Sequence, residues 1–221
     1  MPDTPLLSLE NICFAYADRP PVFSDLCFFL NKNDQIGLQG PNGCGKTTLL
    51  RLVMGLEKPQ QGRILFNGVS IDNAETLRNM RCSIGFVLQN SDDQLFLPSV
   101  LDDVAFGPLN LGLGRKQARE RAMETLEAMG IANLADRLTH RLSGGEKKMV
   151  SIATVLSMRP QALLLDEPTT FLDSEAMGRI VETLQQQDIA KIIVSHDTQF
   201  LKQTTTSCLV VRDGKLARVS L

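Results

Sequence analysis

The sequence lacks both a membrane-spanning segment and a secretion signal. No apolar run in its 221 residues approaches the roughly 18 residues that a bilayer requires. Residues 1–30 contain no basic segment followed by a long apolar one. The five cysteines are scattered and form no C-x-x-C pair, which disfavours a disulfide framework or a zinc site. We therefore expect a soluble cytoplasmic protein with free thiols.

A strong charge of either sign is also missing. The formal net charge is −2, which gives no electrostatic reason to expect a nucleic-acid partner. The content of 43% hydrophobic and 22% charged residues is ordinary for a globular protein. The length allows one large domain, or a core with a small insert.

The apolar segments predict two kinds of strand. Three short segments, SIGFVLQ, ALLLDEP and KIIVSHD, each contain an unbroken apolar run, which is typical of strands covered on both faces in a parallel sheet. Residues 6–16 and 22–30 instead read as half-buried strands. The pairs Asn67-Gly68 and Asp213-Gly214 predict tight hairpins.

The middle of the chain predicts helices. From Ser99 to about Met158 the spacing of apolar residues is helical, and Gly130 ends one of these helices. The residues that share the buried face of that helix are Ala118, Ala122, Leu126 and Met129. We expect an α/β core with a parallel sheet, a small antiparallel β layer and a helical insert.

A phosphate-binding loop is predicted at residues 40–47. GPNGCGKT fits G-x-x-x-x-G-K-[ST] and lies between a predicted strand and a predicted helix. The glycines let the backbone N–H groups point at phosphate oxygens, Lys46 adds a positive charge, and Thr47 offers a hydroxyl to Mg²⁺. The alternative is a glycine-rich turn without a ligand, which the strand–loop–helix context disfavours. Cys44 is interpreted as a small filler in the loop.

Polar residues follow the other buried strands. Asp166 and Glu167 end LLLDEP, where the first could hold Mg²⁺ through water and the second could polarise an attacking water. The alternative is a strand that simply ends in a turn at Pro168. Gln89 and His196 end two further strands, although a single histidine is usually structural. Because the carboxyl ends of parallel strands form the ligand crevice of such sheets, these endings and the loop are expected to face one nucleotide.

The stretch LSGGEKK contains a second helix start. Ser143 and Glu146 have the spacing of a capping box. Gly144 and Gly145 each cost about 1 kcal/mol relative to Ala in a helix, so an ordinary cap does not explain them. Bare backbone at a helix N-terminus favours close approach of an anion. One nucleotide could use both helix starts if two copies packed head to tail.

Together these motifs resemble those of the ATP-binding-cassette (ABC) ATPases, in the order of that family and over nearly the whole chain. GPNGCGKTT resembles Walker A, Gln89 the Q-loop, LSGGE the signature, LLLDE Walker B, TTFLD the D-loop and His196 the H-loop. The resemblance implies one nucleotide-binding domain over residues 1–221, with a P-loop NTPase (RecA-like) core and a helical subdomain at about 97–158. It implies ATP and Mg²⁺ as cofactors, and hydrolysis is expected because the catalytic set is intact.

The resemblance also implies the roles of the site residues. Each ATP would lie between one P-loop and the signature of a second copy, with His196 at the γ-phosphate and Asp173 linking the two sites. Tyr16 resembles the aromatic residue that stacks on adenine, although it could be a strand aromatic. Glu146 and Phe171 depart from the usual glutamine and small residue. Mg²⁺ would be held by Thr47, Gln89 and Asp166. Catalysis would involve Glu167, His196 and Gln89. The residues that would contact the nucleotide are Tyr16, Gly40, Pro41, Asn42, Gly43, Cys44, Gly45, Lys46, Thr47, Thr48, Ser143, Gly144 and Gly145.

Within the family, LQNSDDQLF followed by SVLDDVAFGPLNLGL resembles the ATPase of energy-coupling-factor importers, with the branch serving cobalt and nickel most similar. Other branches serve vitamins such as biotin, and the motif does not separate them. This likeness implies separate integral-membrane subunits, a second ATPase subunit (identical or paralogous), and a peripheral location at the cytoplasmic face of the membrane. The alternatives are a soluble cassette ATPase acting on DNA or ribosomes, and a regulator without hydrolysis, which would be expected to lack Glu167 or His196.

The segment LQNSDDQLF itself could be a metal site. Asp92 and Asp93 are adjacent, however, and an extended backbone would point them to opposite sides. We therefore expect only Gln89 to reach the Mg²⁺ of the nucleotide, and the rest to form a hinge towards the membrane partner. Ser99 and Asp102 predict a second capping box just beyond it.

Overall fold

The larger of two sheets has six strands. The structure is a computed structural model that describes residues 4–170 and 172–219. The strand order is β10-β9-β3-β8-β7-β6; β10 is antiparallel to β9 and all other pairs are parallel. The three segments with unbroken apolar runs form its strands β6, β7 and β8, as predicted. The strand bounds are β3 (Gln35–Gln39), β6 (Ile84–Val87), β7 (Ala162–Asp166), β8 (Ala190–Val194), β9 (Ser207–Arg212) and β10 (Lys215–Val219).

The smaller sheet is antiparallel, with the order β2-β1-β4-β5. Both predicted hairpins are confirmed: Asn67 and Asp213 have φ of 49° and 50°, and a glycine with positive φ follows each. These dihedrals match a turn whose twist fits the flanking strands. The strand bounds are β1 (Leu7–Phe14), β2 (Phe23–Leu30), β4 (Gln61–Phe66) and β5 (Val69–Ser70).

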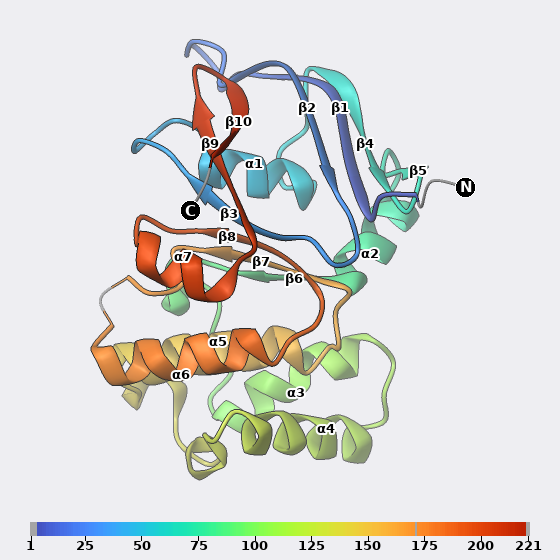
Figure 1. The fold of residues 1–221 in the computed structure, drawn as a ribbon. Coiled ribbons are helices and arrows are strands. Elements are labelled where there is room, and N and C mark those ends of the chain that lie inside the picture. Colours follow the sequence, from blue (N-terminus) through green and yellow to red (C-terminus); the bar gives the residue numbers. More distant parts are fainter. Residues whose placement is uncertain (1–3, 171, 220–221) are drawn as a thin grey trace.

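Helices cover both faces of the six-stranded sheet (Figure 1). In β7, Leu163 and Leu165 face a core shared with the helical part, whereas Leu164 faces a core shared with α1 and the antiparallel sheet. Apolar side chains on both faces explain why this strand shows no alternation. The helix bounds are α1 (Lys46–Val53), α2 (Ala74–Ser83), α3 (Val100–Asn110), α4 (Arg115–Ala128), α5 (Gly144–Leu156), α6 (Ser174–Gln185) and α7 (Thr198–Thr204), with short 3₁₀ turns η1 (Ser91–Asp93), η2 (Ala132–Leu134) and η3 (Thr139–Arg141).

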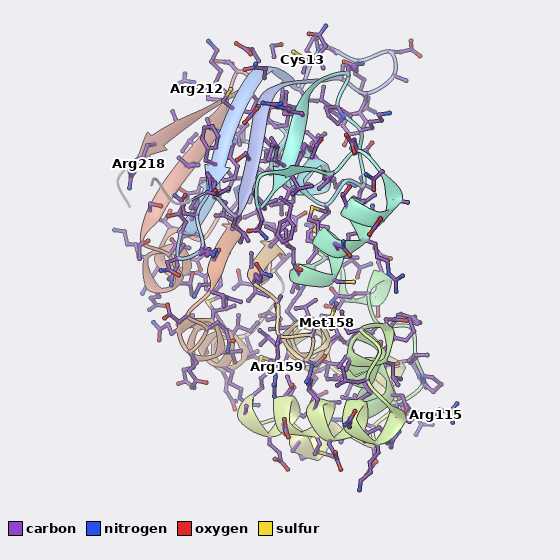
Figure 2. The ribbon with its side chains drawn as sticks, turned by 90° about the vertical axis from the view of Figure 1, so that its right-hand side faces the viewer. Cys13, Arg115, Met158, Arg159, Arg212 and Arg218 are labelled. Carbon is purple, nitrogen blue, oxygen red and sulfur yellow. The ribbon has the colours of Figure 1, made fainter. Side chains whose placement is uncertain are left out.

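The helices α3, α4 and α5 form the helical part of the molecule. Figure 2 shows Arg115 on α4 at the end opposite Cys13 of the antiparallel sheet. Ala118, Ala122, Leu126 and Met129 are buried on one face, as predicted. The α/β class with an antiparallel layer and a helical insert is thus confirmed. Since α5 also packs against β6, it joins the helical part to the sheet.

Pro108 lies inside α3, where it leaves one carbonyl without a helical partner. Proline has no N–H, so the carbonyl of Val104 receives no bond from position 108. The buried hydroxyl of Ser157, just after α5, lies 2.8 Å from that oxygen and 3.0 Å from the Thr154 carbonyl oxygen. The Ser157 hydroxyl, at the end of α5, therefore supplies the Val104 carbonyl of α3 with the hydrogen-bond donor that Pro108 lacks. At Gly107, an added Cβ would lie only 2.5 Å from Met158 Cγ, so the two helices approach closely here.

We predict that Ser157→Ala lowers the free energy of unfolding by about 1–3 kcal/mol, because a buried carbonyl then lacks a partner. Urea denaturation followed by circular dichroism measures this, with the exposed Ser24→Ala as the control, expected within about 0.5 kcal/mol of the wild type. Equal stability of Ser157→Ala and the wild type would contradict the account.

Candidate nucleotide-binding site

A large cleft lies at the carboxyl ends of the parallel strands. It has a volume of about 1070 Å³ and is lined by residues from six separate segments of the chain. The P-loop borders it along with four polar residues that follow buried strands: Gln89, Asp166, Glu167 and His196. The structure thus brings together the residues that the sequence placed at one sheet edge.

The P-loop has a conformation that needs glycine. Gly45 caps α1 with φ of 108°, and a Cβ there would lie 2.6 Å from Val22 Cγ1. Gly40 has φ of 145°, and a Cβ there would lie 2.7 Å from Cys44 Sγ. At Gly43, with φ of 76°, no atom of the described residues lies within 4 Å of an added Cβ. Gly40 and Gly45 are therefore packed against other residues of the chain, whereas Gly43 faces open space where a ligand can approach.

Lys46 carries a positive charge at the start of α1. Its Nζ donates hydrogen bonds to the carbonyl oxygens of Gly40 and Pro41, at 2.8 and 3.1 Å. These bonds hold the ammonium inside the loop rather than in solvent. A fixed cation beside the N–H groups of a helix N-terminus is an arrangement suited to phosphate.

Asp166 is joined to the P-loop by a side-chain hydrogen bond. Thr47 Oγ1 donates to Asp166 Oδ2 at 2.7 Å across a sequence separation of 119 residues. Asp166 is only 3% exposed, and its Oδ1 is buried with no hydrogen-bond partner in the described part of the chain. Burial raises the pKa of Asp166, while the Thr47 hydroxyl and the Lys46 ammonium oppose that shift. A buried, unpaired carboxylate oxygen beside a hydroxyl is a donor set that fits Mg²⁺.

Glu167 has a strained backbone and a partly exposed side chain whose Oε1 atom is buried. Its φ is 47°, a left-handed value that costs a non-glycine residue about 1–3 kcal/mol. His196 Nε2 lies 3.3 Å from Glu167 Oε1 without hydrogen-bond geometry, and the His196 N–H donates to Oε2 at 3.4 Å. Burial raises the pKa of Glu167 and the His196 charge opposes it. Such a carboxyl group, at the edge of a cleft, has the features of a general base.

Tyr16 lies on the wall of the cleft. It sits two residues beyond the end of β1, so it is not a strand residue. Its hydroxyl is 3.2 Å from Thr48 Oγ1, and its ring contacts Phe14 edge-on with centroids 4.9 Å apart. The position is compatible with stacking on a base, which stays a prediction.

The signature segment starts α5 with the predicted capping box. Ser143 Oγ accepts from the Glu146 N–H at 3.3 Å, and the Ser143 N–H donates to Glu146 Oε2 at 2.7 Å. The Ser143 N–H bond, followed by Ser143 Oγ and Arg137, lowers the pKa of Glu146. Glu146 is therefore turned back onto its own helix start.

The two signature glycines have different surroundings. A Cβ on Gly145 would lie 3.0 Å from Ala176 Cβ, so α5 and α6 approach closely there. A Cβ on Gly144 would have no described atom within 4 Å. Neither glycine nor Ser143 lines the P-loop cleft; Ser143 and Gly145 instead line a smaller hollow of about 220 Å³ that also includes Asp173. The chain does not bring its signature to its own P-loop.

Asp173 caps α6 beside this hollow. Its Oδ1 accepts a hydrogen bond from the Ala176 N–H at 2.8 Å. The proposed link between two sites stays a prediction, and Phe171, the departure noted in the D-loop, lies outside the described residues.

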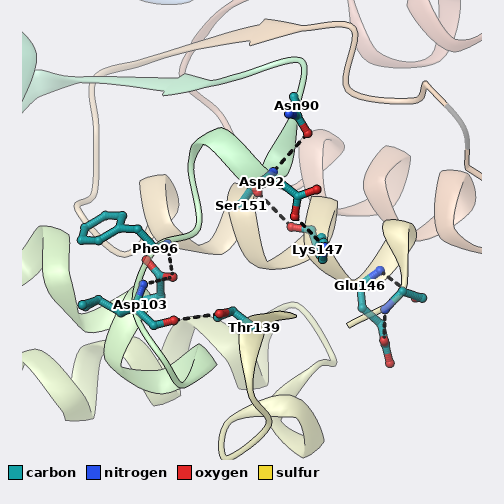
Figure 3. Close-up of polar contacts among 10 residues, drawn as sticks. Asn90, Asp92, Phe96, Asp103, Thr139, Glu146, Lys147 and Ser151 are labelled. Carbon is teal, nitrogen blue, oxygen red and sulfur yellow. Dashed lines mark hydrogen bonds and ion pairs between the residues drawn. The ribbon is translucent and has the colours of Figure 1, made fainter. Parts of the chain in front are cut away.

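The LQNSDDQLF segment does not have the extended backbone that we expected. Residues Ser91–Asp93 form the turn η1, because the Asn90 side chain accepts from the Asp92 N–H at 3.2 Å and starts it. Asp92 pairs with Lys147 Nζ at 2.5 Å (Figure 3). Over residues 4–170 and 172–219, no group of three or more His, Cys, Asp or Glu residues is placed to hold a metal ion.

The predicted capping box at Ser99 is only half formed. Ser99 Oγ accepts from the Asp102 N–H at 3.2 Å, as expected. The Asp102 carboxylate accepts from the Ser99 hydroxyl at 2.7 Å and pairs with Arg119, so it does not return to the Ser99 N–H. One Asp102 carboxylate oxygen is occupied by the Ser99 hydroxyl and the other by Arg119, which accounts for the difference.

Lys148 and Gln94 contact the segment around Gln89 and were not predicted from the sequence. Lys148 Nζ donates to the carbonyl oxygens of Leu88 and Gln89, and Gln94 bridges the same segment to α5. The available signal was a lysine in register with the buried positions Ile152 and Val155 of α5. For Gln94, which is one of several polar residues in its segment, the sequence gives no signal that it contacts α5.

Comparison with known proteins identifies the family. A family model described as ABC transporter matches residues 23–170. The energy-coupling factor transporter ATP-binding protein EcfA of Methanothermobacter thermautotrophicus is 39% identical over 215 residues, covering 96% of this chain and 69% of EcfA. The cobalt import ATP-binding protein CbiO of Rhodobacter capsulatus is 38% identical over 217 residues, covering 96% of this chain and 78% of CbiO.

A solved structure supports the same family assignment. The cbiO1 protein of Clostridium perfringens, described as part of the ABC transporter complex cbiONQ, has a TM-score of 0.84 and 36% identity, covering 97% of this chain and 87% of cbiO1. No helix in the described residues has the length and apolarity to cross a membrane. The predicted P-loop NTPase fold of a nucleotide-binding domain is confirmed. The chain belongs to the family of ABC transporter ATP-binding proteins.

Proposed function

We propose that this ABC ATPase is the energy-supplying subunit of an energy-coupling-factor importer, and that it drives uptake of cobalt or nickel through separate membrane subunits. The single observation that carries the ATPase chemistry is the joining of Thr47 to Asp166 at 2.7 Å, beside Glu167. The likeness to EcfA, CbiO and cbiO1 supports the importer class. The choice between cobalt, nickel and a vitamin such as biotin belongs to the membrane subunits.

The residues of the cleft divide the chemistry among them. The P-loop N–H groups and Lys46 bind the phosphates of ATP, and Thr47, Asp166 and Gln89 would hold Mg²⁺. Bound Mg²⁺ neutralises charge on the transferred phosphate. Glu167 accepts a proton from the attacking water, and its raised pKa brings it closer to the pH at which it works. His196, 3.3 Å from Glu167, faces the same place and contacts the γ-phosphate in this proposal.

A second copy of the ATPase would complete the site. Nothing within the described chain requires glycine at position 144, and yet a glycine starts α5 there at a cost in helix stability. An external ligand explains it: the phosphates of an ATP held by the P-loop of a second cassette, identical or paralogous. Asp173, at the same hollow, would link the two sites.

The membrane subunit would dock beside the segment that follows Gln89. Phe96 is 62% exposed and contacts the exposed Phe106 edge-on at 4.9 Å. The buried Asp103 carboxylate accepts from the Phe96 and Leu97 N–H groups at 3.0 and 3.1 Å, which fixes that segment (Figure 3). Exposed aromatic side chains on a rigid support are suited to a protein partner. The chain would then be peripheral to the cytoplasmic face of the membrane.

Glu167→Gln is expected to bind MgATP but to hydrolyse it at least about 100-fold more slowly, because the proton acceptor is lost. It should also accumulate as a dimer on gel filtration with ATP. The exposed Glu182→Gln on α6 is the control and should hydrolyse normally. Normal turnover in Glu167→Gln would place the base elsewhere.

Gly144→Leu is expected to retain ATP binding by the single chain and to lose hydrolysis together with ATP-dependent dimerisation. The matched control is Gly178→Leu, since Gly178 is also helical and also has open space around it. Isothermal calorimetry and a phosphate-release assay measure the two quantities. Full hydrolysis by Gly144→Leu would mean that no second nucleotide contacts this helix start.

Cells that lack this protein are expected to lose energy-dependent uptake of cobalt or nickel, measured with radioactive metal. The wild-type gene should restore uptake and Lys46→Ala should not, because its P-loop lacks the phosphate-binding cation. Unchanged metal uptake with impaired biotin uptake would assign the protein to a vitamin branch instead.

A further inference from the structure

The segment that contains Gln89 is fastened to the helix that begins with the signature. We name residues 88–94 the Gln89 loop; it runs from the end of β6 through η1. Three side chains join it to α5, although the sequence separations are 55 to 60 residues. The proposed function above gives no role to these three contacts.

Lys148 makes the central contact. It is 3% exposed, and its Nζ donates to the carbonyl oxygens of Leu88 at 2.9 Å and Gln89 at 2.8 Å. Lys148 lies one helical turn after Gly144, so two successive turns of α5 present the signature and hold the backbone of Gln89.

Gln94 and Lys147 add two further contacts. Gln94 Oε1 accepts from the Leu88 N–H at 3.0 Å, and its Nε2 donates to the Ser151 carbonyl oxygen at 2.8 Å. Lys147 Nζ pairs with Asp92 at 2.5 Å. Figure 3 shows Lys147 and Ser151 on α5 facing η1. The loop is thus fixed at its start, in η1 and at its end.

Burial of the Lys148 ammonium is costly. Burial lowers its pKa to about 8, and Asp166 opposes the shift. The Gln89 carbonyl oxygen does not require a cation, because Gln89 is exposed and water could bind this oxygen instead. A buried charge that the fold could replace by water is a candidate for a functional role.

We propose that Lys148 is a positioning residue for Gln89: through it, the Gln89 loop and the signature Ser143–Gly145 move as one body. Gln89 belongs to the cleft of its own chain, whereas the signature faces the nucleotide of the second cassette. Lys148 therefore links the two composite sites within one chain. The inference rests on the proposed function, because it needs Gln89 to act in ATP hydrolysis.

The first test compares two buried lysines. Lys148→Met keeps the side-chain stem and removes only the ammonium. Lys191→Met is the matched control, because Lys191 is 1% exposed and also donates to two main-chain carbonyl oxygens, those of Leu184 and Gln187, away from the cleft. We expect Lys148→Met to lower kcat about tenfold or more with a Kd for ATP within about twofold of the wild type, whereas Lys191→Met keeps both. Equal kcat values in the two variants would overturn the proposal.

The second test asks whether Lys148 acts through Gln89. In a Gln89→Ala background, Lys148→Met should change kcat by less than about twofold, because the side chain that it positions is already gone. Independent, multiplicative losses would overturn the proposal, since a merely structural lysine would lower kcat in both backgrounds.

Two outcomes keep the test decisive. If Lys148→Met does not fold, Gln94→Met cuts another contact of the same loop and should lower kcat in the same way; an unchanged kcat would overturn the proposal. If Glu167→Gln also hydrolyses ATP normally, the general base assigned in the proposed function is wrong. Loss of hydrolysis in Glu167→Gln, together with wild-type kcat in Lys148→Met, removes only the inference on Lys148.

Discussion

The hydrogen bond from Thr47 to Asp166 is the contact on which the site depends. It joins the first turn of α1 to the end of β7, two segments separated by 119 residues. The bond forms only because β3, which leads into the P-loop, and β7 both pair with β8 in parallel. Their carboxyl ends therefore meet at one edge, so Glu167, directly after β7, and Lys46 of the P-loop after β3 reach the same cleft. The parallel pairing of these strands thus produces the arrangement of the site.

The helix α5 has three roles, and a different set of its residues serves each one. Its apolar face packs in the core with α3, α4 and the sheet. Its first turn leaves Gly144 open to a ligand from outside the chain. Its second turn places Lys148 under the Gln89 loop. A rigid helix that does all three gives a physical route from one nucleotide to the other.

Features that depend on local sequence were predictable. Continuous apolar runs predicted strands that are buried on both faces, Asn-Gly and Asp-Gly pairs predicted the hairpins, and S-x-x-E predicted the cap at Ser143, because each pattern lies within a few residues of sequence. The parallel-sheet rule then grouped the polar strand endings at one edge, and the ABC motifs assigned their expected roles. The order of the six strands was beyond prediction, since it depends on pairings distant in sequence.

The predictions that were wrong concern segments where side-chain hydrogen bonds change the local structure. Asp92 and Asp93 read as extended until the Asn90 amide oxygen is seen to start a 3₁₀ turn. At Ser99 the cap is half formed, because the Asp102 carboxylate accepts from the Ser99 hydroxyl and pairs with Arg119, 17 residues after Asp102. The contacts of Lys148 and Gln94 cross about 60 residues of sequence, so no local pattern could reveal them.

The composite site that we propose holds ATP between the P-loop of one cassette and the signature of another. An experimental structure of the protein with Mg²⁺ and a non-hydrolysable ATP analogue tests this arrangement. We expect two cassettes head to tail, with each γ-phosphate contacting Lys46 of one chain and the Ser143–Gly145 backbone of the other. An analogue enclosed by the P-loop alone, with Gly144 in solvent in a fully liganded assembly, would contradict it.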